Sequence, residues 1–301
     1  NTTWHMNEAT RLNLAARYTY DEKELDMFTI KRASQTPILI PGPTDPSSCS
    51  DAVADGAGSS INCDEDWDEF SPRIGIDYDF RDDIMGYASI SAGFRSGVYN
   101  GRPTATSQVS VADPETLWSY EVGLKSQFWN NRLQINGAIF YNDYEDQQIL
   151  VNRPSDPGAG GLNLLVANAA DSTMWGGEIE FTVLPAQGWT ISGGLAYIDP
   201  EYDEFEQIDQ VTGELEDLSD REFTSVPDWT ANLMAQYEYE FSNASRLRLR
   251  ADLSYKGEIF YTNDEASTAF DRLNADSYTI YNAGITYITA DDKWEFGVFC
   301  R

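Results

Sequence analysis

Histidine is the residue whose scarcity most restricts the chemistry open to this chain. The only histidine among the 301 residues is His5, so Ser-His-Asp triads, Cys-His pairs and His-rich metal sites are all unavailable. Phosphate-binding motifs of the GxGxxG or GxxxxGK[ST] type do not occur. The 50 Asp and Glu residues make carboxylate pairs common, so such pairs do not single out a glycosidase site. The sequence predicts a protein that is not an enzyme, with no resident metal and no cofactor.

The segment from Pro200 to Phe223 is the most acidic part of the chain, and Arg221 is its only basic residue. Its carboxylates are Glu201, Asp203, Glu204, Glu206, Asp209, Glu214, Glu216, Asp217, Asp220 and Glu222. A divalent-cation site is one interpretation, because Ca²⁺ binds several carboxylate oxygens, but the spacing matches no EF-hand loop. We favour the other interpretation, a solvated surface suited to salty water, where ions screen such a charge density.

Two of the three cysteines lie close together in the sequence. Cys49 and Cys63 belong to one stretch rich in Pro, Gly and Ser, and a disulfide between them would fix that loop in an oxidising compartment. The alternative is two unpaired thiols, which an exposed loop outside the cytosol would not protect. We expect the disulfide. Cys300 stands alone and is assigned no role.

Charge and hydropathy argue against two broad classes of protein. The chain has 20 Lys and Arg against 50 Asp and Glu, a formal charge of −30, which disfavours nucleic acid as a partner because phosphates attract positive charge. No run approaches the ~18 apolar residues of a membrane helix. The absence of such a run does not exclude a membrane β-barrel, because the sequence signal of a barrel is dispersed over segments of about ten residues. The chain starts at Asn1 without a signal peptide and stops at Arg301 inside an apparent strand, so we expect a fragment or a processed piece.

Apolar and polar residues alternate along much of the chain, as they do in β-strands. In the stretch from Arg246 to Lys256, Leu247, Leu249 and Leu253 share one face while the intervening charged residues share the other. Twelve such strands are expected. They cover residues 10–20, 23–31, 67–79, 84–95, 115–128, 132–150, 163–183, 188–199, 225–241, 246–261, 273–289 and 293–301.

The connections between these strands alternate between tight turns and long loops. The expected turns are polar and lie at 20–23, 81–83, 130–131, 185–187, 242–245 and 290–292, and the expected long loops lie near 32–66, 96–114, 151–162, 200–224 and 262–272. A soluble sandwich has no reason to sort its connections in this way. An outer-membrane barrel does, with short turns on the periplasmic side and long loops outside.

The two faces of the expected strands differ in a way that suits a barrel wall. One face carries apolar residues such as Ile74, Ile139 and Leu233, and the other carries charges too frequent for a dry core. Aromatic residues gather where strands meet the expected short turns, as in an interfacial girdle. They are Tyr18, Tyr20, Tyr78, Phe80, Phe128, Trp189, Tyr237, Tyr239, Phe241 and Tyr287.

Several of these stretches resemble the barrel of TonB-dependent outer-membrane receptors, especially those for iron complexes. They are residues 12–20 (LNLAARYTY), 70–78 (FSPRIGIDY), 87–101 (YASISAGFRSGVYNG), 114–125 (PETLWSYEVGLK) and 136–148 (NGAIFYNDYEDQQ). The resemblance implies an antiparallel transmembrane barrel of about twenty-two strands around a plug, driven through a TonB-binding segment. Residues 1–301 would then be a partial barrel domain of about twelve strands, without the plug domain, the first strands and the last strand.

The function that the resemblance implies is TonB-dependent uptake of a scarce nutrient chelate, such as a ferric siderophore, in a Gram-negative outer membrane. The other partners would be the TonB complex, reached through the missing N-terminal region, and outer-membrane lipid and lipopolysaccharide. The alternatives are a passive diffusion porin and a secreted soluble β adhesin. The sequence does not separate ferric siderophores from cobalamin, haem, nickel chelates or oligosaccharides as cargo.

Candidate ligand contacts lie where an expected strand runs into a long loop. They are Arg95, Tyr99, Asn100, Arg102 and, in the next long loop, Arg153, which could bind an anionic or catecholate-type ferric chelate through charge-assisted hydrogen bonds and stacking. The alternative is that Arg95 and Arg102 offset nearby acids or contact lipopolysaccharide. Arg246, Arg248 and Arg250 form a ladder that faces the lumen, where we expect plug carboxylates rather than cargo as partners.

Overall fold

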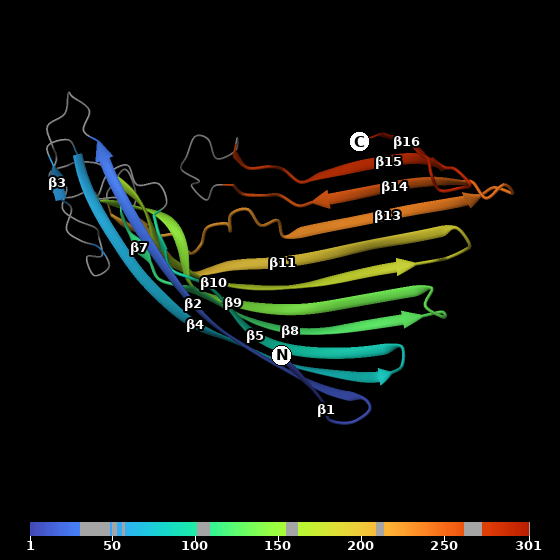
Figure 1. Ribbon diagram of the computed structural model, residues 1–301, viewed down its shortest axis with the longest axis horizontal. Coiled ribbons are helices and arrows are strands. Elements are labelled where there is room, and N and C mark those ends of the chain that lie inside the picture. Colours follow the sequence, from blue (N-terminus) through green and yellow to red (C-terminus); the bar gives the residue numbers. More distant parts are fainter. Residues whose placement is uncertain are drawn as a thin grey trace.

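A computed structural model describes residues 1–30, 49, 53–55, 58–100, 109–154, 162–208, 214–261 and 273–300. In this part of the chain, one antiparallel sheet of fourteen strands dominates, and its order along the main path is β1-β2-β4-β5-β8-β9-β10-β11-β13-β14-β15-β16 (Figure 1). The strands are β1 (Thr2–His5), β2 (Thr10–Ile30), β3 (Val53–Asp55), β4 (Gly58–Arg81), β5 (Ile84–Arg95), β6 (Val98–Tyr99), β7 (Val111–Ala112), β8 (Glu115–Phe128), β9 (Leu133–Pro154), β10 (Leu162–Val183), β11 (Trp189–Ile208), β12 (Leu215–Asp217), β13 (Trp229–Glu240), β14 (Arg246–Lys256), β15 (Tyr278–Ile288) and β16 (Glu295–Cys300).

The short connections gather at one end of the sheet and the long ones at the other, which confirms the predicted sorting (Figure 1). The β8–β9 turn contains Asn130 and Asn131 with φ of 55° and 65°, a left-handed backbone that Asn tolerates. The β10–β11 turn contains Gly188 with φ of 79°, where a Cβ would meet the backbone oxygen of Glu238 at 2.4 Å. We call the two ends of the sheet the turn end and the loop end.

The turn predicted at residues 20–23 is wrong. The strand β2 continues through it for 21 residues, and Tyr20 to Lys23 pair without interruption with residues 65–68 of β4. The first short connection instead lies at residues 6–9, between β1 and β2, where Asn7 Oδ1 accepts hydrogen bonds from the backbone N–H groups of Ala9 and Thr10. Twelve strands lie on the main path, but one of them, β1, was not expected.

Strand residues occur within the predicted long loops 32–66, 96–114, 151–162 and 200–224. β4 begins at Gly58, inside the segment expected as a loop over 32–66, and β11 runs to Ile208, where β12 pairs with it inside the expected loop 200–224. At about 3.3 Å per residue, a strand as long as β4, with 24 residues, spans roughly 80 Å, well beyond a bilayer core of about 30 Å. The tall strands therefore extend past any membrane at the loop end.

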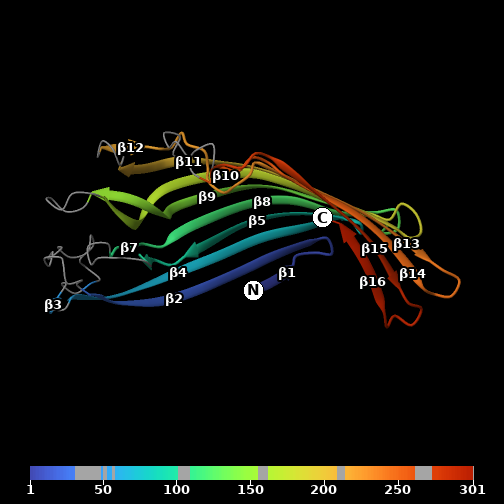
Figure 2. The ribbon, with the colours of Figure 1, turned by 90° about the horizontal axis from the view of Figure 1, so that it is seen from above.

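The sheet curves into an open trough, and β1 and β16 form its two edges in the described residues (Figure 2). We call the side in phase with Ile74, Ile139 and Leu233 the apolar face and the side in phase with Asp77 and Asn136 the polar face. Pairing keeps this phase from strand to strand: Ile74 lies opposite Ile90, and Leu233 opposite Leu253. Large side chains of the apolar face are exposed, with Ile139 66% exposed, so the described residues do not cover this face.

Buried side chains concentrate at the loop end instead. One cluster joins Ile61, Cys63, Tyr99 and Val109, and another joins Ala170, Phe205 and Leu218. Among the described residues, no helix has the length and apolar character needed to cross a bilayer. The fold is thus a sheet with one apolar and one polar face, and its buried side-chain clusters lie near the loops.

Candidate functional site

A small hairpin of β6 and β7 lies on the polar face at the loop end, between β4 and β10. Tyr99 and Val109 pack against Ile61 and Cys63, which alternate in phase with Asp77 on β4. On the other side, Ser110 Oγ donates a hydrogen bond to the backbone oxygen of Val166 on β10 at 3.0 Å. The hairpin therefore bridges strands that are not neighbours in the sheet and lines the mouth of the trough.

The start of this hairpin is fixed to β2 and β4. Lys23 Nζ donates hydrogen bonds to Ser96 Oγ at 2.6 Å and to the backbone oxygen of Gly97 at 2.7 Å, and it lies 5.6 Å from the centre of the Trp67 ring. Ser96 Oγ in turn donates to Asp21. A Cβ on Gly97 would lie 2.2 Å from Cε2 of Trp67, so only glycine fits against this indole.

The other side of the hairpin is organised by a buried carboxylate, Glu115, which is 3% exposed. Its Oε1 accepts hydrogen bonds from Arg95 Nη1 at 3.1 Å and from the Tyr144 hydroxyl at 2.7 Å, and its Oε2 accepts one from the backbone N–H of Gln148 at 2.7 Å. Gln148 Nε2 donates to the backbone oxygens of Ser96 and Asp113, at 3.0 and 2.9 Å. A buried carboxylate with three donors is well satisfied, so this network holds the wall and the hairpin together.

The five predicted ligand contacts differ in exposure and in position. The Arg95 side chain is 64% exposed on the polar face while Glu115 holds its guanidinium. Tyr99 and Asn100 are both buried, at 6% exposure. Arg153 lies in β9 opposite Asn163, and Arg102 lies outside the described residues. The ligand-binding role of all five stays a prediction, and sequence reasoning missed Glu115, Tyr144 and Gln148.

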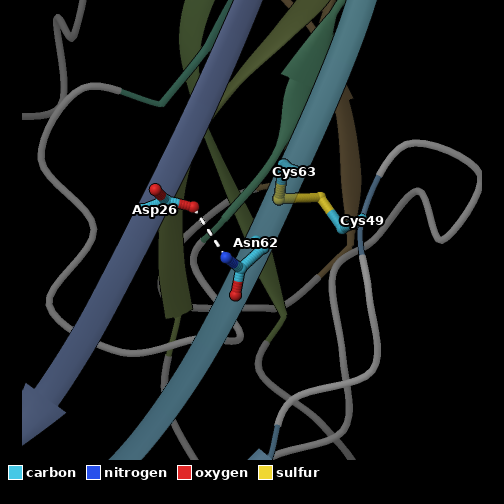
Figure 3. Close-up of a disulfide and its surroundings, with 4 residues drawn as sticks. All are labelled: Asp26, Cys49, Asn62 and Cys63. Carbon is cyan, nitrogen blue, oxygen red and sulfur yellow. Dashed lines mark hydrogen bonds between the residues drawn. A yellow bond between two sulfur atoms is a disulfide. The ribbon is translucent and has the colours of Figure 1, made fainter.

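Cys49 and Cys63 are joined by a disulfide with an S–S distance of 2.08 Å (Figure 3). The bond joins Cys49 to β4 on the polar face, where Cys63 packs against Tyr99 and Val109. On the neighbouring position of β4, Asn62 Nδ2 donates a hydrogen bond to Asp26 Oδ1 on β2 at 2.7 Å, as Figure 3 shows. Cys300 is exposed, opposite Ala283 on the apolar face.

Carboxylates of the sheet itself pair with the arginines predicted to face the lumen. Arg246 contacts Glu238 and Asp292, and Arg248 Nε donates to Glu238 Oε2 at 3.1 Å. Arg250 Nε donates to Asp252 Oδ1 at 3.1 Å. All three share the polar face near the turn end, so their positive charges are offset within β13 to β16 and the turn between β15 and β16.

The acidic segment is partly folded rather than a simple loop. Tyr202, Phe205 and Leu218 pack together, and the Tyr202 and Phe223 rings stack with centroids 4.5 Å apart. The Ser219 hydroxyl and backbone N–H donate hydrogen bonds to Asp217 Oδ1, at 2.6 and 3.0 Å, and hold the pKa of Asp217 below its usual value. In the described residues, no group of three His, Cys, Asp or Glu is placed to hold a metal ion.

Aromatic side chains form two rows across the apolar face. One lies near the turn end, as predicted, and the other, which was not predicted, lies eight residues away on the same strands. The pairs are Phe70 and Tyr78, Tyr120 and Phe128, Tyr197 and Trp189, and Trp229 and Tyr237. Eight residues span about 26 Å along a strand, and about 20 Å across the band if the strands tilt by roughly 40°, close to the ~25 Å apolar band of outer-membrane barrels.

Tyr18 and Tyr20 belong to the second row, so their predicted place beside a short turn is wrong. Tyr18 lies opposite Phe70, and Tyr20 lies further toward the loops because β2 continues through residues 20–23. Both side chains are exposed. The apolar face thus has a row of aromatic rings toward the turn end and another toward the loop end.

Comparisons with known proteins agree with this geometry. A protein-family model described as "TonB dependent receptor-like, beta-barrel" matches residues 1–300. The probable TonB-dependent siderophore receptor PiuA of Acinetobacter baumannii is 27% identical over 109 residues, which are 36% of this chain and 13% of that protein.

Solved structures share the fold. The ferric yersiniabactin uptake receptor FyuA of Yersinia pestis superimposes with a TM-score of 0.69 at 16% identity, over 95% of this chain and 36% of that one. The ferric-catecholate import receptor Fiu of E. coli K12 gives a TM-score of 0.64 at 18% identity, over 95% of this chain and 37% of that one. The chain therefore spans little more than a third of the length of these structures.

Proposed function

Since the chain belongs to the family of TonB-dependent receptor β-barrels, we propose that the protein containing it takes up a ferric siderophore across the outer membrane. Residues 1–301 would supply about twelve strands of the barrel wall, and the rest of the wall, the plug and the TonB-binding segment would come from other parts of the protein. The family and its structural relatives are Gram-negative outer-membrane proteins, and this chain is one of them.

The observation that carries this proposal is the contrast between the two faces. An exposed apolar face with aromatic rows at both edges fits lipid, whereas the polar face carries ion pairs such as Arg11 with Asp79 and Arg248 with Glu238 and fits a water-filled interior. A soluble adhesin would have to cover Ile139 and its exposed neighbours with a further layer. A lipid-facing wall needs no such cover.

Energised uptake agrees with the family and the named relatives better than passive diffusion does. At the loop end, the hairpin of β6 and β7 is fixed on the polar face through Lys23, Glu115 and Ser110. The named relatives PiuA, FyuA and Fiu are siderophore or ferric-complex receptors. Family membership adds the TonB-dependent class of transport, which a porin lacks.

In this proposal the ligand arrives at the loop end and meets Arg95 on the polar face. The Arg95 guanidinium can donate to an anionic oxygen of the ligand while Glu115, itself hydrogen-bonded to Tyr144, holds the orientation of the guanidinium. The iron is cargo and is carried by its chelator. Lipid and lipopolysaccharide would contact the apolar face, and the TonB complex would act through a segment outside this chain.

Growth rescue tests the proposal directly. A strain lacking the native receptors for the chelates, starved of iron, would receive the full-length protein and be offered defined ferric catecholate, hydroxamate and carboxylate chelates one at a time. We expect rescue by at least one chelate and its loss when tonB is deleted. Rescue that survives the deletion, or channel conductance by the purified protein without an energy source, would decide for a porin.

A further inference from the structure

Two arginines on the polar face, Arg17 on β2 and Arg73 on β4, differ from the other arginines described above. Arg11, Arg95, Arg246, Arg248 and Arg250 each pair with a carboxylate of this sheet. Arg17 and Arg73 are exposed and form no ion pair with any residue in the described ranges. With 50 acidic residues against 20 basic ones in the chain, a lack of available carboxylates does not explain this.

The pairing register places these two arginines side by side. Arg17 lies opposite Ser71, and Arg73 is two residues further along β4, so the two are diagonal neighbours on one face, with Cα atoms about 7–8 Å apart. Both have the alternation phase of Arg11 and Asp77, which contact each other on the polar face. Glu69, opposite Thr19, is the diagonal carboxylate on the other side of Arg17, and it forms no ion pair with either arginine.

Three serines lie beside the pair in the sheet. Ser71 lies opposite Arg17, Ser91 lies opposite Arg73 on β5, and Ser119 lies opposite Ser91 on β8. Small side chains leave both guanidinium groups open to the interior, and hydroxyl groups add neutral donors for anionic oxygens. Like charges this close repel each other, so the arrangement suits a group with negative charge that the sheet does not supply.

The geometry points to a second, deeper anion site, in which Arg17 and Arg73 bind an oxyanion of the transported ligand, a carboxylate or catecholate oxygen of an anionic metal chelate. This inference rests on the proposed function and names the charge class of its substrate. Arg95 lies four residues beyond Ser91 on β5, toward the loops, so an anion that enters at the loop end would meet Arg95 first and the Arg17–Arg73 pair next. The site favours anionic over neutral chelates.

The test uses two iron(III) complexes of similar size and different charge, the trianionic tris-catecholate and the uncharged tris-hydroxamate, with the full-length receptor in detergent. The double variant Arg17→Gln/Arg73→Gln should bind the trianion about tenfold or more weakly, because each charge-assisted hydrogen bond contributes on that scale, and the neutral complex unchanged. Arg17→Lys/Arg73→Lys should recover part of the affinity. Arg81→Gln, an exposed arginine at the turn end, is the matched control and should bind both complexes as the wild type does.

Several outcomes would overturn the inference: equal weakening for both complexes, no weakening, or no binding of the trianion to the wild type. Unchanged binding with a lower unfolding temperature would assign the arginines to a carboxylate of the polypeptide inside the barrel. Growth rescue without binding of the trianion would leave the proposed function standing and remove this site. Arginine-dependent binding of the trianion without growth rescue would do the reverse.

Discussion

Arg95 Nη1 lies 3.1 Å from Oε1 of Glu115, so an exposed guanidinium is held by a carboxylate that is itself buried. The same oxygen accepts the Tyr144 hydroxyl, and the other carboxylate oxygen accepts the backbone N–H of Gln148. The position of Arg95 at the mouth of the trough is therefore set by β8 and β9 rather than by its own strand alone.

Glu115→Gln should destabilise the loop end. One carboxylate oxygen becomes an amide nitrogen, which accepts no hydrogen bond, so either the Gln148 N–H or the Arg95 and Tyr144 donors lose their acceptor, and an unsatisfied buried donor costs about 1–3 kcal/mol. Thermal unfolding of the full-length protein in detergent would measure the change. Glu145→Gln, an exposed carboxylate on β9, is the control and should shift the unfolding temperature little. Equal shifts for the two variants would contradict the role of Glu115.

Gly97→Ala should also weaken the hairpin, by about 1–3 kcal/mol, because the new methyl group overlaps the rigid Trp67 ring and the backbone oxygen of Ala112. Gly93→Ala is a close control on the adjoining strand, since its Cβ would meet nothing within 4 Å. Protease sensitivity of the loop end, compared between the two variants, would report the difference. If Gly97→Ala is as resistant as Gly93→Ala, the packing against Trp67 does not hold the hairpin.

The disulfide between Cys49 and Cys63 predicts a simple labelling pattern. When the protein is unfolded without reductant, alkylation should modify Cys300 and leave the other two cysteines unmodified, as peptide mass spectrometry would show. Replacing both paired cysteines with Ala should lower stability by about 3 kcal/mol at most, the chain-entropy value for a closed loop of about 15 residues. Alkylation of Cys63 without reductant would contradict the bond.

The β15–β16 turn should contribute stability that depends on pH. The Thr289 hydroxyl donates to Asp291 Oδ1 at 2.7 Å, and with the backbone N–H of Lys293 it holds the pKa of Asp291 below its ordinary value of 3.8. A depressed pKa means that the carboxylate stabilises the fold above pH 3.8 and that this contribution is lost as the pH falls through the lower folded-state pKa.

Asp291→Ala should therefore unfold at a lower temperature than the wild type at pH 7, and the gap should close in strong acid. Asp82→Ala removes an exposed carboxylate from the short turn between β4 and β5 and serves as the control, with little effect at either pH. A gap that stays constant from pH 7 into acid would show that the Asp291 charge is not what stabilises this turn.

Local sequence predicted the wall well and its internal contacts poorly. Alternation and the Asn130–Asn131 turn are properties of neighbouring residues, so they could be read directly. Tyr20 to Lys23 looked like a turn because Asp21, Glu22 and Lys23 are polar, yet Asp21 and Lys23 are directed at Ser96, more than seventy residues away. Glu115 and Tyr144 are 29 residues apart, and no local pattern joins them. An acid at the start of a strand, on its polar face and just after a long loop, is the one signal that could have drawn attention to Glu115.

The assignment of lipid to the apolar face predicts opposite outcomes for two adjacent residues. Leu233 lies midway between Trp229 and Tyr237 on β13, with 41% of its surface exposed, and Asn232 is next to it on the polar face. Leu233→Lys would place a charge in the middle of the apolar band and should destabilise the folded barrel by about 2–4 kcal/mol. Asn232→Lys places the same charge at the same depth in the interior and should be tolerated. The amount of heat-modifiable barrel recovered from outer membranes would measure both, and equal recovery of the two variants would contradict a lipid-facing role for this side of the sheet.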